Sequence, residues 1–218
     1  MTRLIFEAEA GQRIDLSHHD LSGLDLSDLD FKGANLAHSN LSGADLTGAN
    51  LESTDLTGAM LDRSILMSAN FSNASMQNAS IRRPATYTNM HFNQWDVPNF
   101  NNADLKGSRF IARLDGADFG NADLSGVDFV SEIGMGAGPS LSLSNCDFSG
   151  ATLTTASLSG LNLSHSSFRD ADLRRADLSH VDLANADLNG ADLNGADLSG
   201  AMLEGAIGLQ MTQTDGGR

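Results

Sequence analysis

The sequence lacks the features that would place it outside the cytoplasm or in a membrane. It has one cysteine, Cys146, so it holds no intrachain disulfide framework, and this composition fits a reducing compartment. Residues 1–12 contain no long apolar stretch ending in a small-residue cleavage site, which a Sec-type signal needs. No run approaches the roughly 18 apolar residues of a membrane span. We therefore expect a cytoplasmic protein without a membrane span, with secretion by a route that uses no Sec-type signal as the alternative.

Basic residues are also scarce, with 13 Lys and Arg against 28 Asp and Glu, for a formal charge of −15. A field of that sign repels a phosphate backbone, which argues against direct binding of nucleic acid and favours a protein partner. Aromatic residues make up only 6% of the chain. The core must therefore be built from small and medium side chains.

What the chain does contain is a repeat of five residues. A large apolar residue recurs at every fifth position, and a second, mostly small residue stands two positions before each. The first run is Leu16, Leu21, Leu26, Phe31, Leu36, Leu41, Leu46, Leu51, Leu56, Leu61, Leu66, Phe71, Met76 and Ile81. The second run is Leu143, Phe148, Leu153, Leu158, Leu163, Phe168, Leu173, Leu178, Leu183, Leu188, Leu193, Leu198 and Leu203.

A period of five suits neither an α-helix nor a flat strand. Five residues advance a helix by about 140° beyond a full turn, which scatters the leucines around the axis. On a strand an odd period places successive leucines on opposite faces. A chain that turns by about 90° every five residues keeps them all inside. Glycine is frequent two residues after the leucine, as at Gly33 and Gly43, where a type II corner needs positive φ. Four such sides form a coil of 20 residues.

The tandem motif A-(D/N)-L-x-x appears as Ala34-Asn35-Leu36, Ala44-Asp45-Leu46 and Ala191-Asp192-Leu193. On these residues the sequence resembles the pentapeptide-repeat family over about Ile14 to Ala206. The resemblance implies an all-β fold, the right-handed quadrilateral β-helix. It implies little about function, because one architecture hosts many functions.

We expect one solenoid domain over residues 1–218. Its parts are an N-terminal cap (1–13), a regular block (14–81), interrupted repeats (82–142), a second regular block (143–206) and a C-terminal cap or tail (207–218). Three spacings between large apolar residues fall one short of a multiple of five: Ile81 to Met90, Phe110 to Phe119, and Phe129 to Leu143. Proline and glycine favour loops at 82–97 and 130–142. Between Phe110 and Phe119 either a loop or a four-residue side ending at Leu114, with Ala112 as its small partner, is possible.

No pattern indicates catalysis, a cofactor or a metal. The histidines lack a metal-ligand spacing, and Cys146 occupies a small inward position, where a buried hydrophobe is expected. The arginines near the breaks supply positive charge without a nucleophile or base. We therefore predict a protein that is not an enzyme.

Three sets of residues are candidates for binding. Arginine and aromatic residues in the first break have the composition of binding hot spots, although Met90 and Trp95 could instead fill the wall: Arg82, Arg83, Tyr87, His91, Phe92 and Trp95. Outward aspartates stack one coil apart and form a possible acidic face, although their short side chains could simply bond nearby backbone: Asp172, Asp177, Asp192 and Asp197. An apolar cluster near the C-terminus is either a cap or a homodimer seam: Met202, Ile207, Leu209 and Met211.

The function predicted is an acidic scaffold that acts by binding protein. Two alternatives follow from the family resemblance. Some members mimic duplex DNA and bind DNA gyrase, which protects it from quinolones, and related proteins of that branch often dimerise through their C-terminal ends. Others are secreted bacterial effectors or immunity factors.

Overall fold

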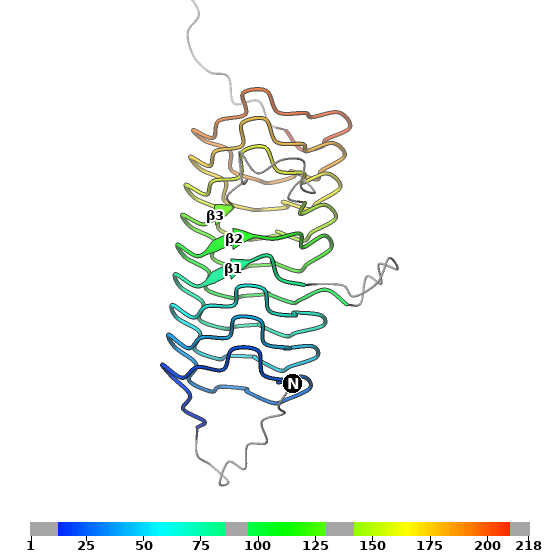
Figure 1. Ribbon diagram of the computed structural model, residues 1–218. Helices are drawn as coiled ribbons and strands as arrows, with labels where there is room; N and C mark the ends of the chain where they lie inside the picture. The colour runs from blue at the N-terminus through cyan, green and yellow to red at the C-terminus, as the bar shows by residue number, and fades with distance from the viewer. Residues whose placement is uncertain (1–12, 86–95, 130–141, 210–218) are drawn as a thin grey trace, which may run out of the picture.

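Main-chain hydrogen bonds join each coil of the chain to the next throughout the computed structural model, which describes residues 13–85, 96–129 and 142–209. In the regular blocks a residue bridges in parallel to the residue twenty positions on, as Asp15 does to Asn35 and Asn162 does to Asp182. Four such bridges occur in each coil, one on each side. Figure 1 shows the resulting stack of coils. The chain is a β-helix.

The ladder is regular because each side offers the same backbone groups. The amide of Leu16 donates to the carbonyl oxygen of Asn35 (2.7 Å), and the amide of Asn35 donates back to the carbonyl oxygen of Ile14 (2.8 Å). Three short strands extend this pairing on one face: β1 (Ser80–Arg82), β2 (Arg109–Ile111) and β3 (Asp128–Phe129). They form a parallel sheet in the order β1-β2-β3 (Figure 1). Within the described residues the structure has no helix long and apolar enough to cross a bilayer.

The corners do not depend on glycine as strongly as the sequence suggests. At a typical corner the amide of Ala34 donates to the carbonyl oxygen of Phe31 (2.8 Å), and Gly33 between them has φ +68°. The same place elsewhere holds asparagine, aspartate, histidine, serine, arginine or threonine, also at positive φ, as at His38 (φ 58°) and Thr155 (φ 57°). The bonds to the neighbouring coils impose this conformation on residues that otherwise disfavour it.

A single continuous core fills the interior. The inward leucines and phenylalanines from Leu16 to Leu188, with the small residues two positions before them, are buried. On one side the rings form a column with centroids 4.9–5.1 Å apart, at Phe71, Phe100, Phe119, Phe148 and Phe168. Dispersion and the removal of apolar area from water stabilise this column.

Hydrogen bonds locate the two long interruptions. The amide of Leu66 bonds to Ala85, 19 positions on, whereas that of Ser68 bonds to Asp96, 28 positions on. Nine extra residues therefore lie between Ala85 and Asp96. The predicted loop at 82–97 begins too early, because Arg82 and Ala85 keep their ladder bonds.

The second interruption has the same length. The amide of Phe129 bonds to Ser157, 28 positions on, and that of Leu143 bonds to Asn162, 19 positions on. Nine extra residues thus fall within 130–141, and Ser142, predicted to end the loop, already bridges to Asn162. The excursions themselves lie outside the described residues.

The remaining irregularity is a four-residue side. Asn99 bridges to Asp118, only 19 positions on. Phe110 and Leu114 are both buried, and Ala112 between them is 4% exposed. Of the two possibilities left open by the spacing, the short side is the one observed. This coil therefore closes with 19 residues, one fewer than a regular coil of 20.

Candidate protein-binding surfaces

The four aspartates of the predicted acidic face occupy two faces of the coil. Asp172 bridges to Asp192, and Asp177 bridges to Asp197, so each pair stacks one coil apart. Five residues separate the two pairs, which places them on neighbouring sides. The predicted stacking is confirmed, and the carboxylates form two rows that meet across a corner.

Each of these aspartates also holds its own corner. The Oδ1 atom accepts a hydrogen bond from the amide two residues on, at 3.1 Å for Asp172, 3.0 Å for Asp177, 3.0 Å for Asp192 and 2.9 Å for Asp197. Asparagine does the same elsewhere, as Asn35 does for Ala37 (3.1 Å). These bonds turn the chain and offset the repulsion between stacked carboxylates.

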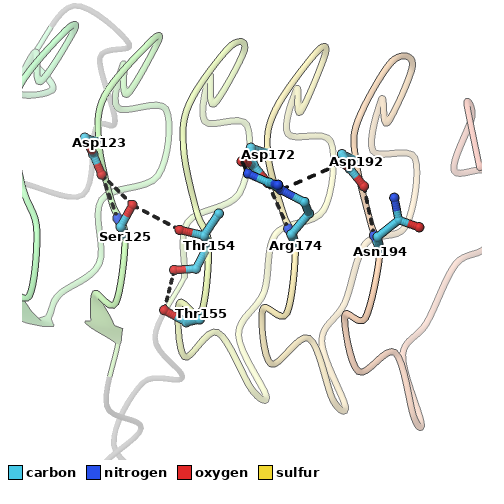
Figure 2. A network of polar contacts seen from close by, with 8 residues as sticks. All are labelled: Asp123, Ser125, Thr154, Thr155, Asp172, Arg174, Asp192 and Asn194. Atoms are coloured by element: carbon cyan, nitrogen blue, oxygen red, sulfur yellow. Dashed lines mark hydrogen bonds and ion pairs between the residues drawn. The ribbon is translucent and has the colours of Figure 1, made fainter.

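An arginine offsets part of the negative charge of one of the two rows. Figure 2 shows Arg174 between Asp172 and Asp192. Its Nη2 lies 2.6 Å from Asp172 Oδ2, and its Nε lies 3.8 Å from Asp192 Oδ2. The hydrogen bond from Arg174 lowers the pKa of Asp172, and the same bond raises the pKa of Arg174. The sequence signal for this contact, a basic residue two positions after the aspartate, was missed.

The other row keeps its charge. Asp177 and Asp197 have no lysine or arginine within ion-pair distance among the described residues. The pKa of Asp197 is lowered, chiefly by the hydrogen bond from the Ser199 side chain. Asp197 is exposed and Asp177 is half-buried. This row therefore presents fixed negative charge to solvent.

The last coil exposes apolar side chains. Met202 and Ile207 are 56% and 54% exposed, and Leu203 and Leu209 are only partly buried. Met202 bridges to Asp182 and Ile207 bridges to Asp187, both in the preceding coil. The fourth residue predicted for a dimer seam, Met211, lies outside the described residues, as do residues 1–12 of the predicted N-terminal cap.

Only two of the six residues predicted in the first break can be placed. Arg82 ends β1, and Arg83 follows it at a corner with φ 52°, its amide bonded to the carbonyl oxygen of Ile111 (2.6 Å). The others are outside the described residues: Tyr87, His91, Phe92 and Trp95.

Sequence reasoning missed a second group of outward residues. The bridging position before the inward residue holds Asp, Asn, Ser or Thr in most coils. Met60, Ile65, Ala85 and Arg109 break this rule in the middle of the molecule. Comparing that single position along the repeats would have found them.

The side chains with potential chemistry do not converge. Within the described residues no group of three or more His, Cys, Asp or Glu is placed to hold a metal ion. Burial raises the pKa of the Cys146 thiol, whose Sγ lies 3.1 Å from the carbonyl oxygen of Leu114. His18 and His38 stack at 5.1 Å on successive coils.

A comparison with models of known protein families shows which family the chain belongs to. The model described as pentapeptide repeats matches eight copies, over residues 12–48, 44–83, 112–131, 141–170 and 171–207. The chain belongs to the pentapeptide-repeat family. No curated protein matches this pentapeptide-repeat protein.

Several solved structures are similar to this pentapeptide-repeat protein. HetL, involved in heterocyst differentiation regulation in the cyanobacterium Nostoc sp. strain PCC 7120, is 27% identical, with 91% of this chain and 92% of HetL covered and a TM-score of 0.43. QnrB1, a plasmid-mediated fluoroquinolone resistance protein, is 19% identical in a trypsin-treated variant form, with 87% and 89% covered and a TM-score of 0.45. A thylakoid-lumen protein of Arabidopsis thaliana is 32% identical over 52% of this chain and 66% of its own, with a TM-score of 0.28.

Proposed function

We propose that this pentapeptide-repeat protein is a non-enzymatic scaffold that binds another protein through its outward rows of side chains. The observation that carries the proposal is the row of Asp177 and Asp197. Each carboxylate is held by a bond from the amide two residues on, which leaves Oδ2 without an ion-pair partner among the described residues. Charges that are already fixed lose little side-chain entropy on binding. A basic protein surface complements this row.

Asparagine supplies a matched test of this proposal. It keeps the oxygen that accepts the backbone bond, as Asn35 and Asn162 show in this chain (3.1 and 3.0 Å), and it removes the charge. Affinity capture should therefore recover a partner with the native chain and lose it with the double variant Asp177→Asn, Asp197→Asn. Equal capture by both proteins contradicts a role for this row.

The DNA-mimicking form of the proposal has one specific observation in its favour, the formal charge of −15. In this form the partner is DNA gyrase and the result is protection from quinolones. The test is supercoiling by purified gyrase with increasing amounts of the protein, with and without a fluoroquinolone. Dose-dependent inhibition, or rescue from the drug, supports it. No effect of the folded protein in either arm contradicts it.

The proposal extends to assembly and location. It includes a right-handed coil, one solenoid domain, a homodimer joined through the last coil, and a cytoplasmic location. Exposed Met202 and Ile207 support the homodimer, since burying large apolar side chains favours association. Fractionation of cells and culture medium tests the location. Recovery in the medium supports the secreted effector or immunity factor instead.

A further inference from the structure

Two exposed histidines form a pair at one corner of the first two coils, at the N-terminal end of the stack (Figure 1). His18 and His38 are 20 residues apart, which is one coil, so they occupy the same corner one above the other. Their imidazole rings stack with centroids 5.1 Å apart and an angle of 15° between the ring planes. A linear spacing of 20 is not a metal-ligand spacing, and only the coil brings the two rings together.

The backbone fixes the positions of both rings. His18 and His38 have φ of 60° and 58°, the corner conformation that recurs along the chain. The amide of His18 donates to the carbonyl oxygen of Ala37 (2.9 Å), and that of His38 donates to the carbonyl oxygen of Thr57 (2.8 Å). A methyl group at Gly58, in the next coil, would lie 2.5 Å from Nδ1 of His38, so the glycine there leaves room for the ring. The two side chains are therefore held beside each other before any ligand arrives.

The ring nitrogens have no other role in the fold. In the part of the chain that the structure describes, neither imidazole makes a hydrogen bond or an ion pair, whereas Nδ1 of the neighbouring His19 lies 2.8 Å from the carbonyl oxygen of Ser17. A neutral imidazole keeps a lone pair on one of its two nitrogens, and it is the commonest metal ligand in proteins. His18 and His38 therefore offer two such lone pairs side by side.

The spacing of the rings suits a metal ion between them. Zinc–nitrogen bonds are about 2.0–2.1 Å long, so two nitrogens bound to one ion lie about 3 Å apart. Rings with centroids 5.1 Å apart bring their outer edges to that distance by tilting toward each other. Imidazole suits Zn²⁺, Cu²⁺ and Ni²⁺, whereas Mg²⁺ and Ca²⁺ prefer oxygen ligands. Within the described residues no third His, Cys, Asp or Glu completes the set, so water supplies the remaining ligands.

The charge around the pair favours a cation. Residues 13–53, which form the two coils, contain seven acidic residues against one arginine and one lysine. Asp15 and Asp20 lie on the two sides that meet at the corner of His18, and each is held by a hydrogen bond from the amide two residues on (3.0 and 3.1 Å). Their carboxylates attract a divalent ion to this corner without binding it directly.

We propose that His18 and His38 bind one divalent transition-metal ion, Zn²⁺, Cu²⁺ or Ni²⁺, between them. The ion joins side chains that are 20 residues apart, so it links the first coil to the second. Because the unfolded chain does not hold the two rings together, binding stabilises the folded chain. The site does not depend on the proposed scaffold function, whose charged row, Asp177 and Asp197, lies on the last coils.

The probe is Zn²⁺ alone, titrated into the metal-free full chain by isothermal titration calorimetry. The test variants are His18→Asn and His38→Asn. Asparagine tolerates the positive φ of both corners, so both variants should fold. The controls are His165→Asn and His180→Asn, which change exposed histidines at corners of the same conformation (φ 60° and 56°) that have no histidine stacked on them in the described coils.

The native chain and both controls should bind one Zn²⁺ with the same affinity. The affinity should be at least about tenfold lower in His18→Asn and in His38→Asn, because each variant loses the second, intramolecular ligand. Zn²⁺ should also raise the Tm of the native chain and leave that of His38→Asn unchanged. No binding to the native chain, equal affinity in all variants, or an equal loss in a control would overturn the proposal. Ring NMR signals of His18 and His38 that do not move with Zn²⁺ would overturn it as well.

Discussion

The ring of Phe119 lies on the ring of Phe148 in the next coil, with centroids 5.0 Å apart and an angle of 3° between the planes. Both rings are fully buried. Because each ring contacts one above and one below, the loss of a single ring opens a gap that the stacked backbone is too rigid to close.

Phe119→Ala should therefore lower the free energy of unfolding by about 3–5 kcal/mol. Phe119→Leu should cost less than about 1.5 kcal/mol, because leucine already occupies this column at Leu51 and Leu188. Chemical denaturation of the two variants measures the difference. Similar midpoints for alanine and leucine would show that the column tolerates a cavity.

Asp177 tests the role of the short side chain at the corner. Asp177→Asn should change stability by less than about 0.5 kcal/mol, because the amide oxygen can still accept the bond from Ser179. Asp177→Ala should cost about 1 kcal/mol, because that bond is lost. Thermal melting compares the pair. If asparagine is as damaging as alanine, the charge itself stabilises the fold.

Thr155 and Thr57 should respond in opposite directions to the same change. Thr155 is a β-branched residue held at φ 57°, so Thr155→Gly should stabilise the protein by about 1 kcal/mol. Thr57 is not among the residues with positive φ, so Thr57→Gly should destabilise it by about 0.5–1 kcal/mol. Denaturant midpoints give both signs. Two destabilising changes would mean that the ladder does not strain Thr155.

Arg174 should govern the titration of Asp172. The pKa of Asp172 is lowered, so its contribution to stability is present above the unfolded value of about 4 and is lost as the pH falls through the folded value. Arg174→Gln should raise the pKa of Asp172 and move acid unfolding to higher pH. Carboxyl NMR titration measures the first effect, and circular dichroism measures the second.

Arg175→Gln is the control for that titration, because Arg175 is the next residue of the same corner, is exposed, and makes no ion pair in the described part of the chain. An unchanged Asp172 pKa in Arg174→Gln would assign the shift to the backbone bond from residue 174 instead.

Met202 tests the proposed homodimer. Met202→Glu places a charge on the exposed apolar end and should convert a dimer into a monomer in sedimentation velocity runs. Met60→Glu, which changes another exposed methionine on a middle coil, should leave the mass unchanged. A native protein that is monomeric at every concentration would contradict the dimer.

The sequence was sufficient for the core and its register, since the five-residue period places each inward residue from Leu16 to Ile81 without help from other information. Three-dimensional contacts decided the rest. The spacing of nine residues between Ile81 and Met90 does not show where the regular coil ends. Ala85 is a small residue that fits a loop as well as a side of the coil, and only its bridge to Ile65 shows that it belongs to the coil. The four-residue side from Phe110 to Leu114 could be distinguished from a loop only by the bridges between neighbouring coils, such as that of Asn99 to Asp118.

Surface roles were harder to predict for a different reason. The five-residue period places Asp172 and Asp177 outward on neighbouring faces, but it does not show that Arg174 forms an ion pair with Asp172. The position of Met60 was visible in the sequence. Only the ladder shows which residues follow it on the same face, Ser80 in the next coil and Arg109 in the coil after that.

The ladder that stacks the coils also sets distances across the outside of the molecule. From the exposed Met60, the pairing passes through Ser80, Arg109, Asp128 and Ser157 to Asp177 in five steps. At about 4.8 Å a step, Met60 and Asp177 stand about 24 Å apart on one face. The β-helix is thus a molecular ruler. A partner that touches both residues must match this spacing, and adding or removing one coil between them would change the gap by a single fixed increment.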